Sequence, residues 1–429
     1  MNTSDEQINL LLDELLFLHP KKIDLSLDRT YKLLAKLGNP QEKIQNSIMC
    51  SGTNGKFSTL NFIKEILRFN NKTINSYISP HLIKFNERFE ILDKIVTNDE
   101  LYKLLSEVKD VNQNENITFF EITTSAFFKI AADNSNADYT LCEIGLGGEF
   151  DSVNVFTPTI SVISAISKDH KEFLSSDIRK IAAAKAGIIK KNVPVVIGYQ
   201  PFDEAKNVLI DYAHSVGAPT WIYGQDFFVT EEGEKIVYVD NDHKIKFDNF
   251  SNYTKFQIKN LGLAIATCLQ LYKIDVNGFL KNNLHQGVYF PGRFEKIKEG
   301  QLFSLINKKN ELYLDGSHNS DAAYNINQSL ISMPKKDLCI IIGMLNTKDP
   351  ENYIKQFSNI KEIKTINIPD EENSIPAIKL KDKLKLVHNN VSEANSIVEA
   401  IKSLASSNPD ARILICGSLY LAGQVLKLN

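Results

Sequence analysis

Residues 48–59 read Ile-Met-Cys-Ser-Gly-Thr-Asn-Gly-Lys-Phe-Ser-Thr, an apolar run followed by a loop that contains two glycines. Leu60, Ile63, Ile66 and Leu67 follow at helical spacing, so the loop joins a buried strand to an amphipathic helix. Backbone N–H groups in such a loop, together with the helix N-terminus, can bind phosphate. The stretch therefore predicts the first strand and helix of a phosphate-binding α/β domain.

The charge of Lys56 in this loop would neutralise the β- and γ-phosphates of a nucleotide. The loop nevertheless departs from the strict P-loop pattern at two positions. Cys50 stands where that pattern has its first glycine, and Phe57 stands where a hydroxyl residue usually follows the lysine. Taken alone, the loop leaves open an ordinary strand–turn–helix unit with a solvated lysine.

Further short apolar runs alternate with helical patterns, at residues 139–144, 160–166, 193–197, 311–314, 338–342, 365–368 and 413–416. Apolar strands separated by helices predict parallel sheets that are covered on both faces. Between about residues 220 and 250, three short strand patterns joined by charged turns predict a small antiparallel insert. Pro291-Gly292-Arg293 predicts the boundary between two domains, which gives residues 1–293 and 294–429.

The composition is that of a soluble globular protein, and 429 residues are too many for one hydrophobic core. A formal net charge of −3 gives no sign of a nucleic-acid-binding or membrane-seeking surface. The five scattered cysteines are expected to be buried thiols in a reducing compartment. The N-terminus predicts an amphipathic helix and not a signal peptide, and no apolar run is long enough to span a bilayer. We therefore expect a cytoplasmic protein.

Two strand ends carry candidate metal ligands. Glu143 ends an apolar strand and is followed by Gly145, Gly147 and Gly148, at the edge where open α/β sheets bind ligands. The alternative is a strand-terminal acid that faces water. His170 follows the next strand in Lys168-Asp169-His170 and is favoured over the other histidines, because its strand should lie beside that of Glu143.

Two further candidates are ambiguous in isolation. Lys185 stands among alanines in a helical pattern and is typical of an exposed lysine, unless it is buried near a metal ion and loses its charge. Asp315 begins Asp-Gly-Ser-His-Asn after a strand, and Asp-Gly is an ordinary turn signal.

In order along the chain, these segments resemble the bacterial dihydrofolate synthase/folylpolyglutamate synthase branch of the Mur ligase family. The resemblance begins at Ile23-Asp24-Leu25 and includes GTNGKFST (52–59), Ser79-Pro80-His81-Leu82, Thr118-Phe119-Phe120-Glu121, EIGLGG (143–148), Asp169-His170, AKAGIIK (184–190), Pro291-Gly292-Arg293, DGSHN (315–319), Gly343-Met344-Leu345 and Cys416-Gly417-Ser418. Each piece is short, but their common order along nearly the whole chain makes the resemblance specific.

The resemblance implies an N-terminal P-loop-type nucleotide-binding domain and a smaller Rossmann-like C-terminal α/β domain. It implies ATP contacts from Gly52, Thr53, Asn54, Gly55, Lys56, Ser58, Asn260, Arg293 and Asp315. It implies magnesium ligation by Ser79, Glu143, His170 and a carbamylated Lys185. Catalytic roles would fall to Lys56, His170, Lys185 and His318, and pteroate or folate binding to Lys22, Ile23, Asp24, Leu25, Thr118, Phe119, Phe120 and Glu121.

The activity that the resemblance implies is ATP-dependent ligation of L-glutamate to dihydropteroate and to tetrahydrofolates through an acyl phosphate. The protein would be a cytoplasmic monomer that binds neither nucleic acid nor membrane. Its expected cofactors are ATP and two magnesium ions, and a monovalent cation could also bind. Two departures from the family pattern, Phe57 in place of glycine and Glu149 in place of arginine, suggest altered affinity.

Three alternatives stay open at this point. Asp24 could cap a helix that begins near Leu25 instead of binding a pterin ring. A peptidoglycan Mur ligase is a second possibility, although only about fifty residues precede Gly52, at or below the lower end of typical domain size. A nucleotide-binding protein without turnover is a third.

Overall fold

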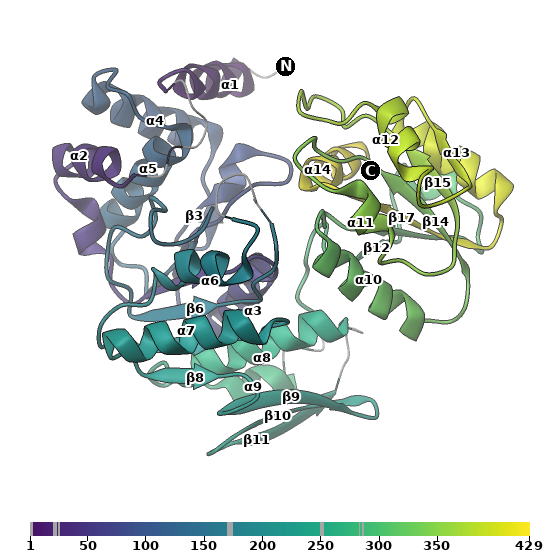
Figure 1. The fold of residues 1–429 in the computed structure, drawn as a ribbon. Coiled ribbons are helices and arrows are strands. Elements are labelled where there is room, and N and C mark those ends of the chain that lie inside the picture. The colour runs from purple at the N-terminus through teal and green to yellow at the C-terminus, as the bar shows by residue number, and fades with distance from the viewer. Residues whose placement is uncertain are drawn as a thin grey trace. The chain divides into compact units, whose positions relative to one another are not determined.

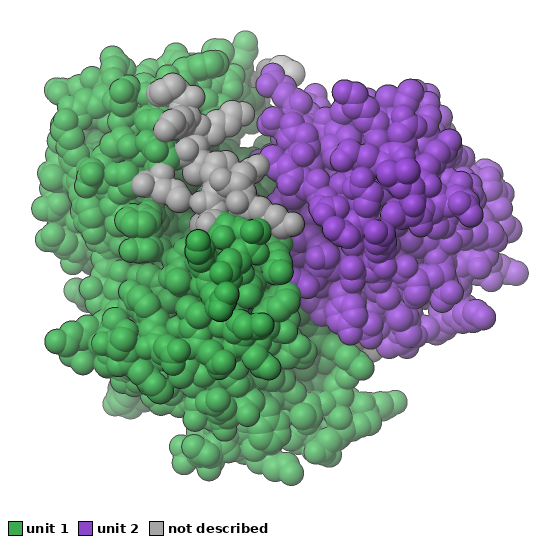
Figure 2. All heavy atoms as spheres, in the orientation of Figure 1, with its two compact units in different colours: residues 1–288 green, residues 289–429 purple. Residues whose placement is uncertain are grey.

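The computed structural model describes residues 3–19, 24, 26–169, 175–248, 253–282, 284 and 287–429. The chain forms two compact units, residues 1–288 and 289–429, shown in different colours in Figure 2. Pro291-Gly292-Arg293 belongs to the second unit, since the carbonyl of Gly292 accepts a hydrogen bond from the N–H of Gly316. Within the described part of the chain, no helix is both long and apolar enough to cross a bilayer.

An eight-stranded sheet with the order β4-β3-β2-β5-β1-β6-β7-β8 organises the first unit. Its strands are β1 (Ser47–Ser51), β2 (Ile74–Tyr77), β3 (Phe89–Ile91), β4 (Lys94–Ile95), β5 (Tyr139–Glu143), β6 (Ile160–Ile163), β7 (Val195–Ile197) and β8 (Thr220–Ile222). Strands β2, β5, β1, β6, β7 and β8 pair in parallel, and β3 and β4 add an antiparallel edge. Every residue of β1 and β5 is buried, as expected for a parallel sheet covered on both faces.

Helices cover this sheet as its apolar strands require (Figure 1). They are α1 (Thr3–Leu16), α2 (Asp28–Lys36), α3 (Lys56–Phe69), α4 (Asn98–Asn112), α5 (Phe119–Asp133), α6 (Ile178–Ala186), α7 (Asp203–Val216), α8 (Lys255–Leu269) and α9 (Val276–Asn282). Met49, Tyr77 and Cys142 share one hydrophobic core with α1, α2 and α4–α7. Helices α3 and α8 pack against each other, and α3 contacts β1, β2 and β5. The predicted parallel sheet between helix layers is confirmed.

A three-stranded antiparallel sheet, β9 (Phe227–Glu232), β10 (Lys235–Asp240) and β11 (Lys244–Asp248), forms the predicted insert. The outer strands β9 and β11 show the alternating burial of a sheet with one covered face, whereas the central strand β10 has three consecutive buried residues, and β9 contacts α8. The insert therefore packs next to the helix that carries Asn260.

The second unit is a six-stranded sheet with the order β12-β13-β17-β14-β15-β16, in which only β12 is antiparallel. Its strands are β12 (Glu295–Ile297), β13 (Glu311–Leu314), β14 (Asp337–Ile342), β15 (Ile360–Thr365), β16 (Val391–Glu393) and β17 (Ala411–Cys416), and its α-helices are α10 (Ser320–Ser332), α11 (Pro350–Ile354), α12 (Ala377–Leu384), α13 (Ile397–Ser407) and α14 (Leu419–Leu428). The predicted strand at 365–368 was misplaced: it covers residues 360–365. The charged residues Lys361, Glu362 and Lys364 give this strand a polar pattern that does not predict a buried strand. Lys364 and Glu362 pair with each other at 3.2 Å along it.

Candidate active site

The phosphate loop between β1 and α3 needs both of its glycines. Gly52 has φ +147° and Gly55 has φ +95°, backbone conformations that side chains disfavour. A Cβ at Gly52 would lie 1.9 Å from Ser164 Oγ, and one at Gly55 would lie 2.5 Å from Asn260 Oδ1. The loop thus fits closely between the end of β6 and helix α8, with its backbone near any ligand of the helix N-terminus.

Side chains and backbone groups fix the same loop to β6. The N–H groups of Thr53 and Asn54 donate to the carbonyl of Ala165 at 2.9 and 3.0 Å. Thr53 Oγ1 and Asn54 Nδ2 bond the backbone and the hydroxyl of Ser167. Through these contacts, Thr53 and Asn54 fix the position of the loop, while Gly55 and Lys56 form the start of α3.

Two lysines converge on the carbonyl of Gly52. Lys185 Nζ donates to it at 2.7 Å and Lys56 Nζ at 3.3 Å, and Lys56 Nζ also lies 3.8 Å from Glu143 Oε1. Lys185 is buried in the last turn of α6, and not exposed as an isolated lysine among alanines would be. Burial, together with the charge of Lys56, lowers the pKa of Lys185 to about 7. The amine is therefore partly neutral near pH 7 and nucleophilic.

Ser79 and Glu143 lie together where β2 and β5 end. The backbone N–H of Ser79 donates to Glu143 Oε2 at 3.3 Å, and Glu143 is buried while Ser79 is half-buried. Ser79 Oγ is buried and has no hydrogen-bond partner among the described residues. A buried polar atom of this kind calls for a ligand, and the pair of hard oxygen donors suits magnesium. The residues present therefore fit the implied metal.

The structure describes only part of the remaining set of expected magnesium ligands. His170 lies outside the described residues. The expectation that the strand before it lies beside that of Glu143 was wrong, because β1 pairs with both β5 and β6 and lies between them. Among the residues that are described, no three side chains of His, Cys, Asp and Glu gather as a metal site.

Asp151 is a buried acid at this edge that the sequence reasoning did not select. Its carboxylate accepts hydrogen bonds from the N–H groups of Leu146 and Val153, each at 2.9 Å, and so shapes the glycine loop after Glu143. Burial raises the pKa of Asp151 to about 6. The signal that could have found it is its fixed distance from Gly147-Gly148 in the Gly-Gly-Xaa-Xaa-Asp pattern.

Helix α8 contributes Asn260 to the far side of the phosphate loop. Asn260 is buried, and its Nδ2 has no hydrogen-bond partner in the described part of the chain. Ser58, in the first turn of α3, is also buried. At the two departures from the family pattern, Phe57 is half-buried and Glu149 is exposed. The N–H of Glu149 donates to Ala184 O at 2.8 Å, and its carbonyl accepts from Asn154 Nδ2 at 3.1 Å.

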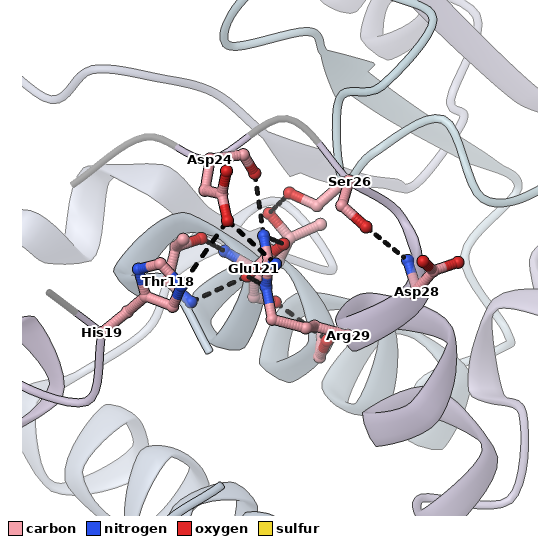
Figure 3. Close-up of polar contacts among 10 residues, drawn as sticks. His19, Asp24, Ser26, Asp28, Arg29, Thr118 and Glu121 are labelled. Atoms are coloured by element: carbon pink, nitrogen blue, oxygen red, sulfur yellow. Dashed lines mark hydrogen bonds and ion pairs between the residues drawn. The ribbon is translucent and has the colours of Figure 1, made fainter. Parts of the chain in front are cut away.

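The expected pteroate segments meet at the start of α5 (Figure 3). Arg29 donates to Glu121 and to Asp24, and the N–H of Thr118 donates to Glu121 Oε2. Asp24 does not cap the next helix: α2 begins at Asp28, whose N–H donates to Ser26 Oγ at 3.2 Å. Lys22, Ile23 and Leu25 lie outside the described residues.

Phe119 and Phe120 connect this region to the glycine loop of β5. Phe120 stacks on Tyr77 with 6.1 Å between ring centroids, and a Cβ at Gly145 would lie 2.7 Å from its ring. Phe119 meets Phe85 edge-on at 5.4 Å. The first turn of α5 therefore borders the same sheet edge as Glu143.

In the second unit, Arg293, Asp315 and His318 gather where β13 ends. Asp315 is buried and accepts from the N–H groups of Phe294 and Ser317, each at 2.7 Å. Burial raises the pKa of Asp315, opposed in part by these bonds and by Arg293. Arg293 Nη1 donates to Gly292 O at 3.2 Å, and His318 Nδ1 lies 3.1 Å from Gly316 O, so Nδ1 carries the proton in this hydrogen bond. Asp315 is therefore a fixed acid and not simply a turn residue.

Comparisons with known proteins cover both units. The family model of the Mur ligase middle domain matches residues 50–268, and that of the dihydrofolate synthetase C-terminal domain matches residues 298–428. The chain is 29% identical over 418 residues to the dihydrofolate synthase/folylpolyglutamate synthase of Bacillus subtilis, with 94% of each chain covered.

Solved structures share the fold. Escherichia coli FolC in complex with DHPP and ADP matches with a TM-score of 0.86 and 22% identity, over 98% of this chain and 97% of that chain. The Yersinia pestis bifunctional folylpolyglutamate synthase/dihydrofolate synthase, complexed with AMPPNP and Mn ion, matches with a TM-score of 0.84 and 21% identity, over 98% and 97%. Since the middle-domain model alone spans just over half of the 429 residues, this chain belongs to the Mur ligase family.

Proposed function

We propose that this protein is an ATP-dependent ligase that joins L-glutamate to dihydropteroate, forming dihydrofolate, and to reduced folates, forming folylpolyglutamates. One observation carries the proposal. The phosphate loop, Lys56, Glu143 and the partnerless hydroxyl of Ser79 form one site at the edge of the sheet. Relatives matched over nearly the whole chain bear the name of this activity.

The chemistry requires a better leaving group than the hydroxyl of a carboxylate. The substrate carboxylate attacks the γ-phosphorus of ATP, the bond to the β,γ-bridging oxygen breaks, and ADP leaves. Lys56 and the backbone N–H groups at the start of α3 stabilise charge on the phosphate oxygens. The amine of glutamate then attacks the acyl carbon, phosphate leaves, and the amine loses a proton to form the amide. Asn260 and Ser58 would hold the nucleotide from the α8 side and from α3.

Magnesium would bind Ser79 and Glu143, with His170 and a carbamylated Lys185 as further ligands, and would neutralise phosphate charge and align the oxygens. Carbamylation of Lys185 is part of this proposal. A buried amine with a pKa of about 7 can react with carbon dioxide, and the product replaces a buried cation by an anion.

Arg293 and Asp315 of the second unit would contact ATP, and His318 would act on the phosphate or on the incoming amine. The segments around Asp24 and residues 118–121 would bind the pteroate or folate portion. The expected reducing, cytoplasmic compartment is supported by five buried cysteines, all free thiols.

The test is release of ADP by the purified protein with ATP, magnesium, L-glutamate and either dihydropteroate or tetrahydrofolate. We expect ADP release that needs both glutamate and a folate-type carboxylate. Release with a UDP-linked peptidoglycan precursor instead would favour a peptidoglycan ligase. ATP binding without turnover on any of these substrates would favour a nucleotide-binding protein.

A further inference from the structure

Glu121 lies in a segment expected to bind substrate, yet its carboxylate is fully used inside the protein. The residue is 4% exposed. Oε2 accepts from Arg29 Nε at 3.0 Å and from the N–H of Thr118 at 2.7 Å, and Oε1 accepts from Arg29 Nη2 at 2.9 Å. A buried carboxylate with three such bonds is a poor candidate for a direct ligand, because binding would first have to break a paired charge.

Arg29 is the group through which Glu121 can act. Its guanidinium offers five N–H donors in a rigid plane. Four hydrogen bonds leave it: two to Glu121, one from Nη2 to the carbonyl of Asp24 at 2.8 Å, and one from Nη1 to Asp24 Oδ2 at 3.1 Å. Figure 3 shows Arg29 between the two acids. Both the backbone and the side chain of Asp24 are therefore held by one cation.

The two carboxylates of this cluster differ in their neighbours and in their exposure. Arg29 bonds both Asp24 and Glu121, and His19 Nε2 also lies 3.6 Å from Asp24 Oδ2. The Asp24 side chain is 34% exposed, whereas that of Glu121 is 5% exposed. Of the two carboxylates, that of Asp24 is therefore the more accessible to the ring N–H and amino groups of a pterin.

The other end of the cluster is equally fixed. Thr118 and Glu121 form a capping box at the N-terminus of α5, in which Thr118 Oγ1 accepts from the N–H of Glu121 at 3.3 Å. That same helical turn carries Phe120, whose ring borders Gly145. Arg29 therefore joins Asp24 to a helix start that touches the glycine loop of the catalytic edge.

We infer that Arg29 and Glu121 are positioning residues: Glu121 holds Arg29, and Arg29 holds Asp24 in place for the pterin portion of the substrate. This inference rests on the proposed function and refines it, since it removes Glu121 from direct contact with substrate. It gives the carboxylate of Glu121 a role without assigning it any contact to the ligand.

The test compares Michaelis constants in the full-length enzyme. Arg29→Met and Glu121→Gln should each raise KM for dihydropteroate at least about tenfold, with KM for ATP and kcat within about twofold. Glu121→Gln is nearly isosteric and keeps an acceptor for Thr118, so it tests the idea even where Arg29→Met folds poorly. The double variant should raise KM for dihydropteroate no more than the more damaging single variant does, because both residues act through Asp24.

Two further variants separate positioning from stability. Arg29→Lys keeps the positive charge but not the planar set of N–H donors. Compared with Arg29→Met, it should therefore recover Tm and leave KM for dihydropteroate high. Arg68 is the matched control: it bonds Glu65, Glu90 and Asp93 through a similar half-buried guanidinium. Arg68→Met should lower Tm and leave KM for dihydropteroate unchanged.

Three results would overturn the inference. The first is an equal rise in the KM values for ATP and dihydropteroate with a lower Tm, and the second is additive losses in the double variant. Full rescue of KM by Arg29→Lys is the third. If the wild-type protein glutamylates neither dihydropteroate nor tetrahydrofolate, the proposed function fails, and this inference fails with it. Wild-type turnover with unaffected variants would remove the inference alone.

Discussion

Replacing Lys56 by alanine removes the cation nearest to Glu143 at the phosphate loop. Lys56 Nζ lies 3.8 Å from Glu143 Oε1. Two unit charges about 4 Å apart interact with about 4 kcal/mol at an effective dielectric constant of about 20. A phosphate oxygen that gains charge at a similar distance would lose an interaction of that size.

The expected loss in turnover follows from this magnitude. Removing one group that stabilises developing charge costs roughly 10²–10³ in kcat, or about 2.7–4 kcal/mol, which agrees with the Coulomb figure. We therefore expect Lys56→Ala to lower kcat by two to three orders of magnitude, about what those free energies give. The charge of Lys56 also lowers the pKa of Lys185, so its removal should raise that pKa.

The assay is ADP release at saturating ATP, folate substrate and glutamate, with circular dichroism and Tm as checks on folding. Lys64→Ala is the matched control, since Lys64 stands on the same helix and pairs with Glu90 at 2.9 Å, away from the phosphate loop. It should lower Tm while leaving kcat within about twofold. A folded Lys56→Ala protein with near-wild-type kcat, or equal kcat losses in both variants, would refute the reasoning.

Three other changes probe the same edge. Depleting bicarbonate should lower turnover of the wild type and adding it back should restore turnover, whereas Lys185→Ala should be inactive in both conditions; equal wild-type rates with and without bicarbonate would exclude carbamylation. Burial raises the pKa of Asp151 from 3.8 to about 6, so its contribution to stability is present below about pH 4 and is lost as pH rises through 6. Relative to Asp151→Asn, the free energy of unfolding of the wild type in urea should fall by roughly 3 kcal/mol between pH 4 and 7, at about 1.36 kcal/mol per pKa unit; parallel pH curves would contradict this. Gly55→Ala should add roughly 1–2 kcal/mol of backbone strain and raise the Kd for ATP in calorimetry at least about tenfold. Gly233 also has a positive φ but has open space around it, so Gly233→Ala should lower stability without changing the Kd for ATP. Equal ATP affinity in both variants would argue against the loop geometry.

The sequence was most informative where burial is complete. The β1 and β14 regions are apolar runs because both faces of a parallel strand are covered, and their patterns predicted both sheets. The two glycines of the phosphate loop were equally readable, since only glycine fits beside Ser164 and Asn260.

Edge strands and polar strands were harder to find. In β2, Asn75 is buried because its side chain bonds the N–H of Leu92 and the carbonyl of Asn134, contacts that no local pattern reveals. In β15 the charged residues give the strand a polar pattern, so the sequence did not place it correctly.

The Arg29–Glu121 pair shows the main limit for the site. Its partners are separated by 92 positions, and one sequence without a fold does not bring them together. The same holds for Lys185 and Gly52, which lie 133 positions apart and meet at 2.7 Å. Sequence motifs supplied candidates for the site, but the fold determined which of them touch.

The transfer of oxygen from substrate to phosphate tests the central claim most directly. The assay uses dihydropteroate labelled with ¹⁸O in both carboxylate oxygens, together with ATP, magnesium and L-glutamate, and the products are analysed by mass spectrometry. An acyl phosphate predicts one ¹⁸O atom in each inorganic phosphate released and one in the new amide. Unlabelled phosphate formed together with dihydrofolate, or ADP release that does not depend on glutamate and dihydropteroate, would contradict the account.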